Sequence, residues 1–231
     1  MLNPSFLRSS VGRKAIVGFT GLCLIGFVLA HLLGNLSIFL GPDALNAYAA
    51  KLQHLGPLLW VARIGLLAVA VIHIVFAIQL SIENRAARGP VGYAKQRSIG
   101  TSTAAKTMAL SGMLVLTFII YHLAHFTFGL THPAIAHLKD PLQRHDVYTM
   151  VVLGFQQTPV AIGYVIAMFF LSRHLSHGIQ SMFQSVGLND ERHIPMLEQA
   201  SRVIAGVIFI GYSAIPMAVI CGFLTVSGGR P

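Results

Sequence analysis

The fold is decided by the stretch TGLCLIGFVLAH at residues 20–31, which is apolar throughout and ends on His31. A second stretch, SGMLVLTFIIYH at residues 111–122, repeats its frame and ends on His122. In both, a small hydroxyl residue is followed by a glycine that precedes the histidine by ten positions. Each stretch belongs to a hydrophobic run long enough to cross a bilayer, where a histidine is costly unless the protein uses its imidazole.

The composition is that of an integral membrane protein. The chain has 231 residues, of which 55% are hydrophobic and only 10% charged, and its mean hydropathy is +0.70. A soluble domain carries about a quarter charged residues. The net charge of +9 falls mainly in the connections, so we expect it to set topology and docking rather than nucleic-acid binding. Cys23 and Cys221 lie in apolar runs, which argues against a disulfide framework.

Five apolar runs of about 20 residues or more predict an all-α membrane protein with five transmembrane helices in one domain. They are 16–40, 58–82, 107–130, 151–183 and 203–226. The first run is too long for a signal peptide, so we expect a retained helix. Residues 156–159 are typical of a helix entry, so the fourth helix should begin near Pro159. Pro216 should kink the fifth helix.

Basic residues alternate between the two sides of this predicted bundle. Ten lie in the N-terminal segment and in the second and fourth connections, against four in the first and third connections and the C-terminal segment. The positive-inside rule therefore predicts a multi-pass protein of the cytoplasmic membrane, with its N-terminus in the cytoplasm and its C-terminus outside.

Histidines of the first four helices fall at two predicted depths. Helices one and three run outward and carry His31 and His122 in their outer halves, whereas helices two and four run inward and carry His73 and His174 in their inner halves. Each histidine lies about 5 Å beyond the middle of its run. The spacing predicts two histidine pairs, roughly 10 Å apart along the membrane normal.

Two facing imidazoles in an apolar bundle suit bis-histidine ligation of a b-type haem, because the macrocycle needs an apolar slot and the iron needs two axial donors. We therefore predict two haem b groups, an outer one on His31 and His122 and an inner one on His73 and His174. Glycines on these helices would let a flat ring approach the backbone. They are Gly21 and Gly112, near the inner pair, and Gly65 and Gly163, near the outer pair.

Other readings of the histidines are open. A lone membrane histidine often only hydrogen-bonds across helices, and small residues often serve only helix packing. Zinc or copper is less favoured, because the intramembrane set lacks carboxylates and clustered thiols. The repeated frame selects His122 over His125, whereas spacing alone leaves both His174 and His177 open. The histidine not used could bond a haem propionate, bond a quinone oxygen or face a polar seam.

With these features the chain resembles the cytochrome b subunit of succinate dehydrogenases and fumarate reductases, the single-subunit type with five helices and two haems. The resemblance runs over nearly the whole chain. It rests on the frames of residues 10–14, 20–31 and 111–122, on His73, and on HLSHG at 174–178 followed by Phe183 and Gly187.

In that family the histidines of helices one and three bind the distal haem, and those of helices two and four bind the proximal haem. The resemblance therefore implies distal ligation by His31 and His122 and proximal ligation by His73 and His174 rather than His177. It also implies an electron-transfer subunit that anchors an iron–sulfur subunit and a flavoprotein subunit and exchanges electrons with a quinone, menaquinone in particular. Dicarboxylate chemistry would belong to the flavoprotein.

A quinone site needs a few polar donors in apolar surroundings near a membrane surface. The candidates are Tyr48, Gln53, His54 and Arg63, the last of which could also bind a haem propionate. Some family members use a carboxylate near the distal haem, whereas the outer helical segments here carry no acidic residue.

Two rival functions are consistent with the same sequence. The nearest is the dihaem cytochrome b of a hydrogenase or a formate dehydrogenase. From a different class, a small transporter could also place polar groups at the membrane midplane.

Overall fold

The computed structural model describes residues 9–86, 108–185, 192 and 194–226, and it is an all-α bundle with no strand within those residues. Five helices are long and apolar enough to cross a membrane, which confirms the predicted fold class and indicates a multi-pass membrane protein. They are built on α2 (Ser10–Leu36), α4 (Pro57–Ala86), α6 (Met108–His122), α8 (Thr158–Ser185) and α9 (Ile194–Ile220). Helix α6 reaches this length only together with the turn that follows it, as Met108–Thr127. A 3₁₀ turn, η1 (Ser37–Leu40), extends α2, and a π turn, η2 (Leu123–Thr127), extends α6.

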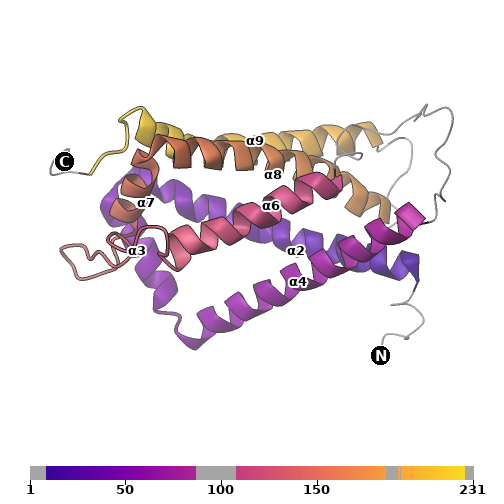
Figure 1. Cartoon of the computed structure of the whole chain (residues 1–231), viewed down its shortest axis with the longest axis horizontal. Coiled ribbons are helices and arrows are strands. Elements are labelled where there is room, and N and C mark those ends of the chain that lie inside the picture. Colours follow the sequence, from indigo (N-terminus) through magenta and orange to yellow (C-terminus); the bar gives the residue numbers. More distant parts are fainter. Residues whose placement is uncertain (1–8, 87–107, 186–191, 193, 227–231) are drawn as a thin grey trace.

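Successive membrane helices run in opposite directions, so the bundle has two distinct ends (Figure 1). We call the end with the N-terminus of α2 the inner end, following the charge prediction, and the opposite end the outer end. Two shorter helices, α3 (Pro42–Gln53) and α7 (Val147–Gln156), lie at the outer end. Most of the basic second connection, residues 87–107, lies outside the described residues. So does Gly187, one of the residues on which the resemblance rests.

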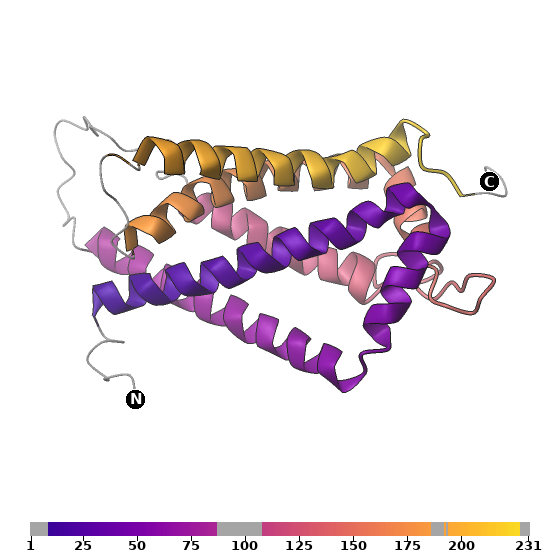
Figure 2. The same ribbon diagram turned by 180° about the vertical axis from the view of Figure 1, so that it is seen from behind.

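Helices α2 and α8 form the centre of the bundle. Helix α8 packs against α9, α2 and α6, whereas α4 packs mainly against α2. Figure 2 shows that α4 lies beside α2 towards the inner end and diverges from it towards the outer end, where α3 joins them. Helix α4 contains no buried residue. The four helices that carry the predicted ligands are therefore not held together by a continuous protein core.

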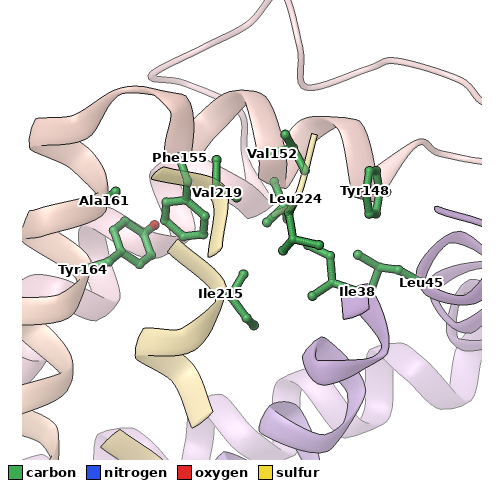
Figure 3. Packing of buried hydrophobic residues seen from close by; sticks show 11 residues of the cluster. Ile38, Leu45, Tyr148, Val152, Phe155, Ala161, Tyr164, Ile215, Val219 and Leu224 are labelled. Carbon is green, nitrogen blue, oxygen red and sulfur yellow. The ribbon is translucent and has the colours of Figure 1, made fainter. Parts of the chain in front are cut away.

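The buried apolar core lies mainly at the outer end. Figure 3 shows its larger cluster, in which side chains of η1, α3, α7, α8 and α9 meet. Its residues include Ile38, Leu45, Val152, Phe155, Tyr164 and Ile215. A smaller cluster joins Leu32 of α2 to Leu175 of α8 and Ile208 of α9. These two clusters fix α2, α8 and α9 against one another.

Element boundaries differ from the sequence prediction in places. The predicted run 151–183 is interrupted at Gln157, which separates α7 from α8; α8 begins at Thr158 with Pro159 in its first turn, as the entry signal predicts. Helix α6 ends at His122 and its π turn at Thr127, before the predicted end at residue 130, because Gly129 adopts a positive φ of 65°. The fifth helix spans Ile194–Ile220 rather than 203–226 and continues past the buried Pro216.

A polar cluster secures the outer end, and its contacts were not predicted from the sequence. Asn46 is buried, and its amide donates to Asp146 Oδ1 at 3.0 Å while its carbonyl oxygen accepts from the Tyr148 N–H at 3.0 Å. Arg144 bonds Asp140 at 2.6 Å and Asp43 at 2.7 Å. Burial alone would raise the pKa of Asp140, but the hydrogen bonds from Arg144 outweigh it and hold that pKa below its usual value.

Candidate functional site

The outer histidines face each other across the bundle. His31 of α2 and His122 at the end of α6 have ring centroids 6.0 Å apart, with the ring planes at 82°. Two metal–nitrogen bonds of about 2 Å, together with the two ring radii, place the centroids of an axial pair about 6 Å apart. The spacing of this pair therefore fits two imidazoles on one metal ion.

Aromatic rings surround the outer pair. Phe27 stacks on His31 at 5.3 Å, and Phe118 lies 5.8 Å from His122. Two tyrosines complete the surroundings, with Tyr212 at 6.1 Å from His31 and Tyr164 at 6.0 Å from His122. The histidines thus lie in an apolar, aromatic environment of the kind that a macrocycle requires.

The inner histidines are each held by a hydroxyl group from the neighbouring helix. His73 of α4 lies with Nδ1 at 3.1 Å from Thr20 Oγ1 of α2. His174 of α8 lies with Nδ1 at 3.3 Å from Ser111 Oγ of α6. Thr20 and Ser111 are themselves buried. The two contacts are equivalent, because both hydroxyls come from the repeated frame of residues 20–31 and 111–122.

The hydroxyl protons fix the tautomer of both inner rings. Thr20 Oγ1 donates to the Ile16 carbonyl at 2.7 Å, and Ser111 Oγ donates to the Met108 carbonyl at 3.0 Å. Each hydroxyl has one proton, and with that proton on the carbonyl it accepts from the histidine Nδ1–H. The lone pair of each imidazole is then on Nε2. A histidine that binds a metal through one nitrogen almost always donates its other N–H in this way.

The glycines of the frame lie directly beside the same two rings. A Cβ added at Gly21 would lie 3.3 Å from His73 Cε1, and one at Gly112 would lie 3.2 Å from His174 Cε1. Both distances are tighter than ordinary van der Waals contact. The hydroxyl and the glycine therefore form the contact site of an inner histidine ring, which we call its seat. The same helix carries an outer histidine ten positions after the glycine. The glycines make room first of all for the histidine ring itself.

The other two predicted haem-packing glycines have different surroundings. Gly65 of α4 and Gly163 of α8 are exposed, and a Cβ added at either would meet no described atom within 4 Å. No described side chain therefore fills the space beside them.

The two competing histidines do not occupy equivalent positions. His125 is only 2% exposed, its Nδ1 lies 3.0 Å from the Tyr164 hydroxyl, and its Nε2 would lie 3.1 Å from a Cβ added at Gly154 of α7. That nitrogen points at a helix backbone, where a metal would have no room. His177 has Nε2 at 3.1 Å from Ser181 Oγ, whereas His174 occupies the hydroxyl–glycine seat. The geometry favours His122 and His174 as ligands.

The four quinone candidates lie at the outer end on exposed positions. Tyr48 covers Gly34 of α2, where a Cβ would collide with the tyrosine hydroxyl. The Arg63 guanidinium lies 5.2 Å from the centre of the Trp60 ring, a cation–π contact rather than a contact with a histidine. Gln53 ends α3 and His54 follows it, both exposed. The structure does not bring these four side chains into one pocket among the residues that it describes.

Tyr164 and Tyr212 contact the outer pair and were not among the residues predicted from the sequence. Both are tyrosines inside apolar helices, and such a tyrosine must find a hydrogen-bond partner for its hydroxyl. That rule could have marked them as polar groups of the interior, although not their partners. Tyr212 donates to the Val28 carbonyl at 2.7 Å, and Tyr164 reaches two histidines.

Comparisons with protein-family models, with curated proteins and with solved structures found no match.

Proposed function

We propose that this protein is a dihaem cytochrome b that anchors a redox enzyme in the membrane and carries electrons between a quinone and a peripheral iron–sulfur subunit. The observation that carries the proposal is the pair of equivalent seats at the inner histidines. In each, a hydroxyl accepts from Nδ1–H, so that Nε2 of His73 or His174 keeps the lone pair that can bind a metal. The outer pair, with ring centroids 6.0 Å apart, supports a second site of the same kind.

Haem iron between two imidazoles would supply one-electron oxidation and reduction. The chain's own residues would hold two such groups at different depths, with His31 and His122 as axial ligands of the outer group and His73 and His174 as those of the inner group. Apolar and aromatic side chains would exclude water from both. Two centres spaced along the membrane normal would let an electron cross most of the bilayer in short steps.

The proposed partners follow from the resemblance described above and from charge. Arg13 at the start of α2 forms an ion pair with Glu83 near the end of α4, and Lys14 and Arg85 lie at the same inner end. This basic face would dock the iron–sulfur subunit, which in turn would carry the flavoprotein that oxidises succinate or reduces fumarate. Menaquinone is the quinone that the resemblance favours.

The first prediction is the haem content of the purified membrane subunit. The four histidines should give two haem b groups per chain, measured as the ratio of haem to protein with a reduced-minus-oxidised absorption spectrum. A preparation that contains no haem would contradict the proposal and favour the transporter. Co-purification of a flavoprotein and an iron–sulfur protein would support the succinate dehydrogenase or fumarate reductase assignment, whereas a metal hydrogenase or a formate dehydrogenase would support the nearest rival.

A second prediction tests the outer quinone site. His54→Ala should slow quinone-linked turnover of the intact complex severalfold, because the exposed imidazole between α3 and α4 is the proposed donor to a quinone oxygen. Both haem spectra should stay unchanged. The matched control is His137→Ala, since His137 is an exposed histidine of the other outer connection. Equal turnover in the two variants would remove His54 from the site.

A further inference from the structure

Tyr164 of α8 joins two histidines through a single hydroxyl group. The residue is 7% exposed and belongs to the outer core cluster, where it packs against Phe155 at 4.9 Å (Figure 3). Its hydroxyl lies 3.0 Å from Nδ1 of His125 and 3.5 Å from Nδ1 of His122. The first distance is an ordinary hydrogen bond, and the second is longer than an ordinary N–H···O bond of about 2.7–3.2 Å.

One proton on the hydroxyl sets the direction of both bonds. Tyr164 can donate to only one of the two nitrogens and must accept from the other. A metal on Nε2 of His122 leaves the proton of that ring on Nδ1, so the Tyr164 hydroxyl accepts from His122 and donates to His125 Nδ1. His125 then carries its own proton on Nε2, which is buried and has no acceptor among the described residues, and this is the cost of the arrangement. The oxygen lone pair is then available to His122, whose Nδ1–H donates to it.

We propose that Tyr164 is a positioning residue for the outer haem, acting through His122, and that His125 sets the direction of its hydroxyl. The assignment rests on the proposed function, because it concerns a histidine as an axial ligand. It gives His122 the same arrangement as the inner ligands: Nδ1–H donated to a hydroxyl oxygen, and Nε2 left for the metal.

Comparison with the inner pair supports this assignment. At His73 and His174 the accepting hydroxyls belong to Thr20 and Ser111, and their protons are used by backbone carbonyls. At His122 the hydroxyl belongs to Tyr164, and its proton is used by His125. In each case a second acceptor takes the hydroxyl proton, so that the oxygen can only accept from the ligand. This gives the buried His125 a role that does not require it to bind metal.

His31 does not share this arrangement. The Asn35 amide nitrogen lies 3.3 Å from both ring nitrogens of His31 and donates to the His31 carbonyl at 2.7 Å. An amide nitrogen cannot accept a hydrogen bond from Nδ1–H. Within the described residues, the outer pair therefore has a hydroxyl acceptor on the His122 side only, and Tyr164 should govern the donor strength of that one ligand.

The backbone forms a π turn at the two histidines that contact Tyr164. The π turn η2 begins directly after His122 and contains His125. Here the turn accompanies two histidines, three residues apart, whose Nδ1 atoms lie within 3.5 Å of one hydroxyl.

The test is Tyr164→Phe, which removes the hydroxyl and keeps the ring. Loss of the acceptor makes the His122 imidazole a weaker donor, so oxidised iron is less stabilised and the midpoint potential of the outer haem should rise. Retention of the outer haem should weaken by about tenfold to a hundredfold. The inner haem should keep its potential and spectrum. Both would be read from a potentiometric titration of the purified subunit and from haem content after dilution.

Tyr212→Phe is the matched control. Tyr212 also lies at the outer pair, 6.1 Å from the His31 ring, but its hydroxyl donates to the Val28 carbonyl and not to a ring nitrogen. This variant should change the midpoint potential of the outer haem less than Tyr164→Phe does. An unchanged outer potential in Tyr164→Phe, or equal changes in both tyrosine variants, would overturn the proposal. Loss of both haems from Tyr164→Phe would also overturn it, by showing a structural role. A wild-type chain without haem would instead refute the proposed function.

Discussion

His122→Ala is expected to remove the outer haem and to leave the inner haem bound, so that the ratio of haem to protein falls by half. The reason is geometric: His122 faces His31 with the ring centroids 6.0 Å apart, whereas the inner histidines are held by Thr20 and Ser111. The alanine would leave the outer iron with one axial donor in apolar surroundings. The remaining haem should keep the spectrum and the midpoint potential of the inner group. His31→Ala should give the same result.

His125→Ala is the control for this prediction. His125 is the more deeply buried histidine of the two on this segment, so a general loss of packing would affect this variant at least as strongly. We expect it to keep both haems, with a change limited to the outer one, because it acts through the Tyr164 hydroxyl. Retention of both haems in His122→Ala, or loss of the outer haem from His125→Ala alone, would exchange the roles of the two histidines.

Features that depend on local sequence could be predicted. Hydrophobic length is a property of consecutive residues, so five spans followed from composition. A fixed rise per residue also converted position in each run into depth, which placed His31 with His122 and Gly21 near His73. The helix entry at Pro159 was predictable for the same reason, because proline at the first turn is a local signal.

Features that depend on contacts between distant residues could not be predicted. The outer polar cluster joins Asn46 to Asp146, and nothing local to either residue specifies the other. Helix α3 was missed because its residues were read only as a connection between membrane runs, although Pro42 and Asp43 are suitable for a first turn. The link from Tyr164 to His122 joins α8 to α6 and likewise required the fold.

The structure changes the interpretation of the repeated frame of residues 20–31 and 111–122. The sequence suggested that its glycines clear space for a porphyrin. In the fold, the hydroxyl and the glycine together seat an imidazole from the next helix, through Thr20 and Gly21 at His73 and through Ser111 and Gly112 at His174. Each helix pair, α2 with α4 and α6 with α8, thus orients its own inner histidine and contributes one outer histidine. Neither pair holds both ligands of a proposed haem.

Gly21→Leu should therefore affect the inner haem, although Gly21 lies on the same helix as His31, a proposed ligand of the outer haem. The added Cβ alone would lie 3.3 Å from His73 Cε1, and the rest of the leucine side chain needs the space of the ring. Overpacking of this kind costs about 1–3 kcal/mol, and the histidine can escape it by turning away from Thr20. We expect retention of the inner haem to fall by at least about tenfold, as when the partner of a ligand is lost. The outer haem should be retained.

Two further variants make this prediction specific. Gly112→Leu should give the same loss, because a Cβ there would lie 3.2 Å from His174 Cε1. Gly206→Leu is the control: Gly206 lies in α9, which carries no histidine, and a Cβ there would meet no described atom within 4 Å. It should keep both haems. Loss of only the outer haem from Gly21→Leu would contradict the role of Gly21 in holding His73. The substitution would then act on His31 of the same helix and not on the contacting ring of His73. Thr20→Val should also lower the retention of the inner haem, as Gly21→Leu does. It removes the hydroxyl that accepts from His73, whereas Gly21→Leu removes the space beside the ring.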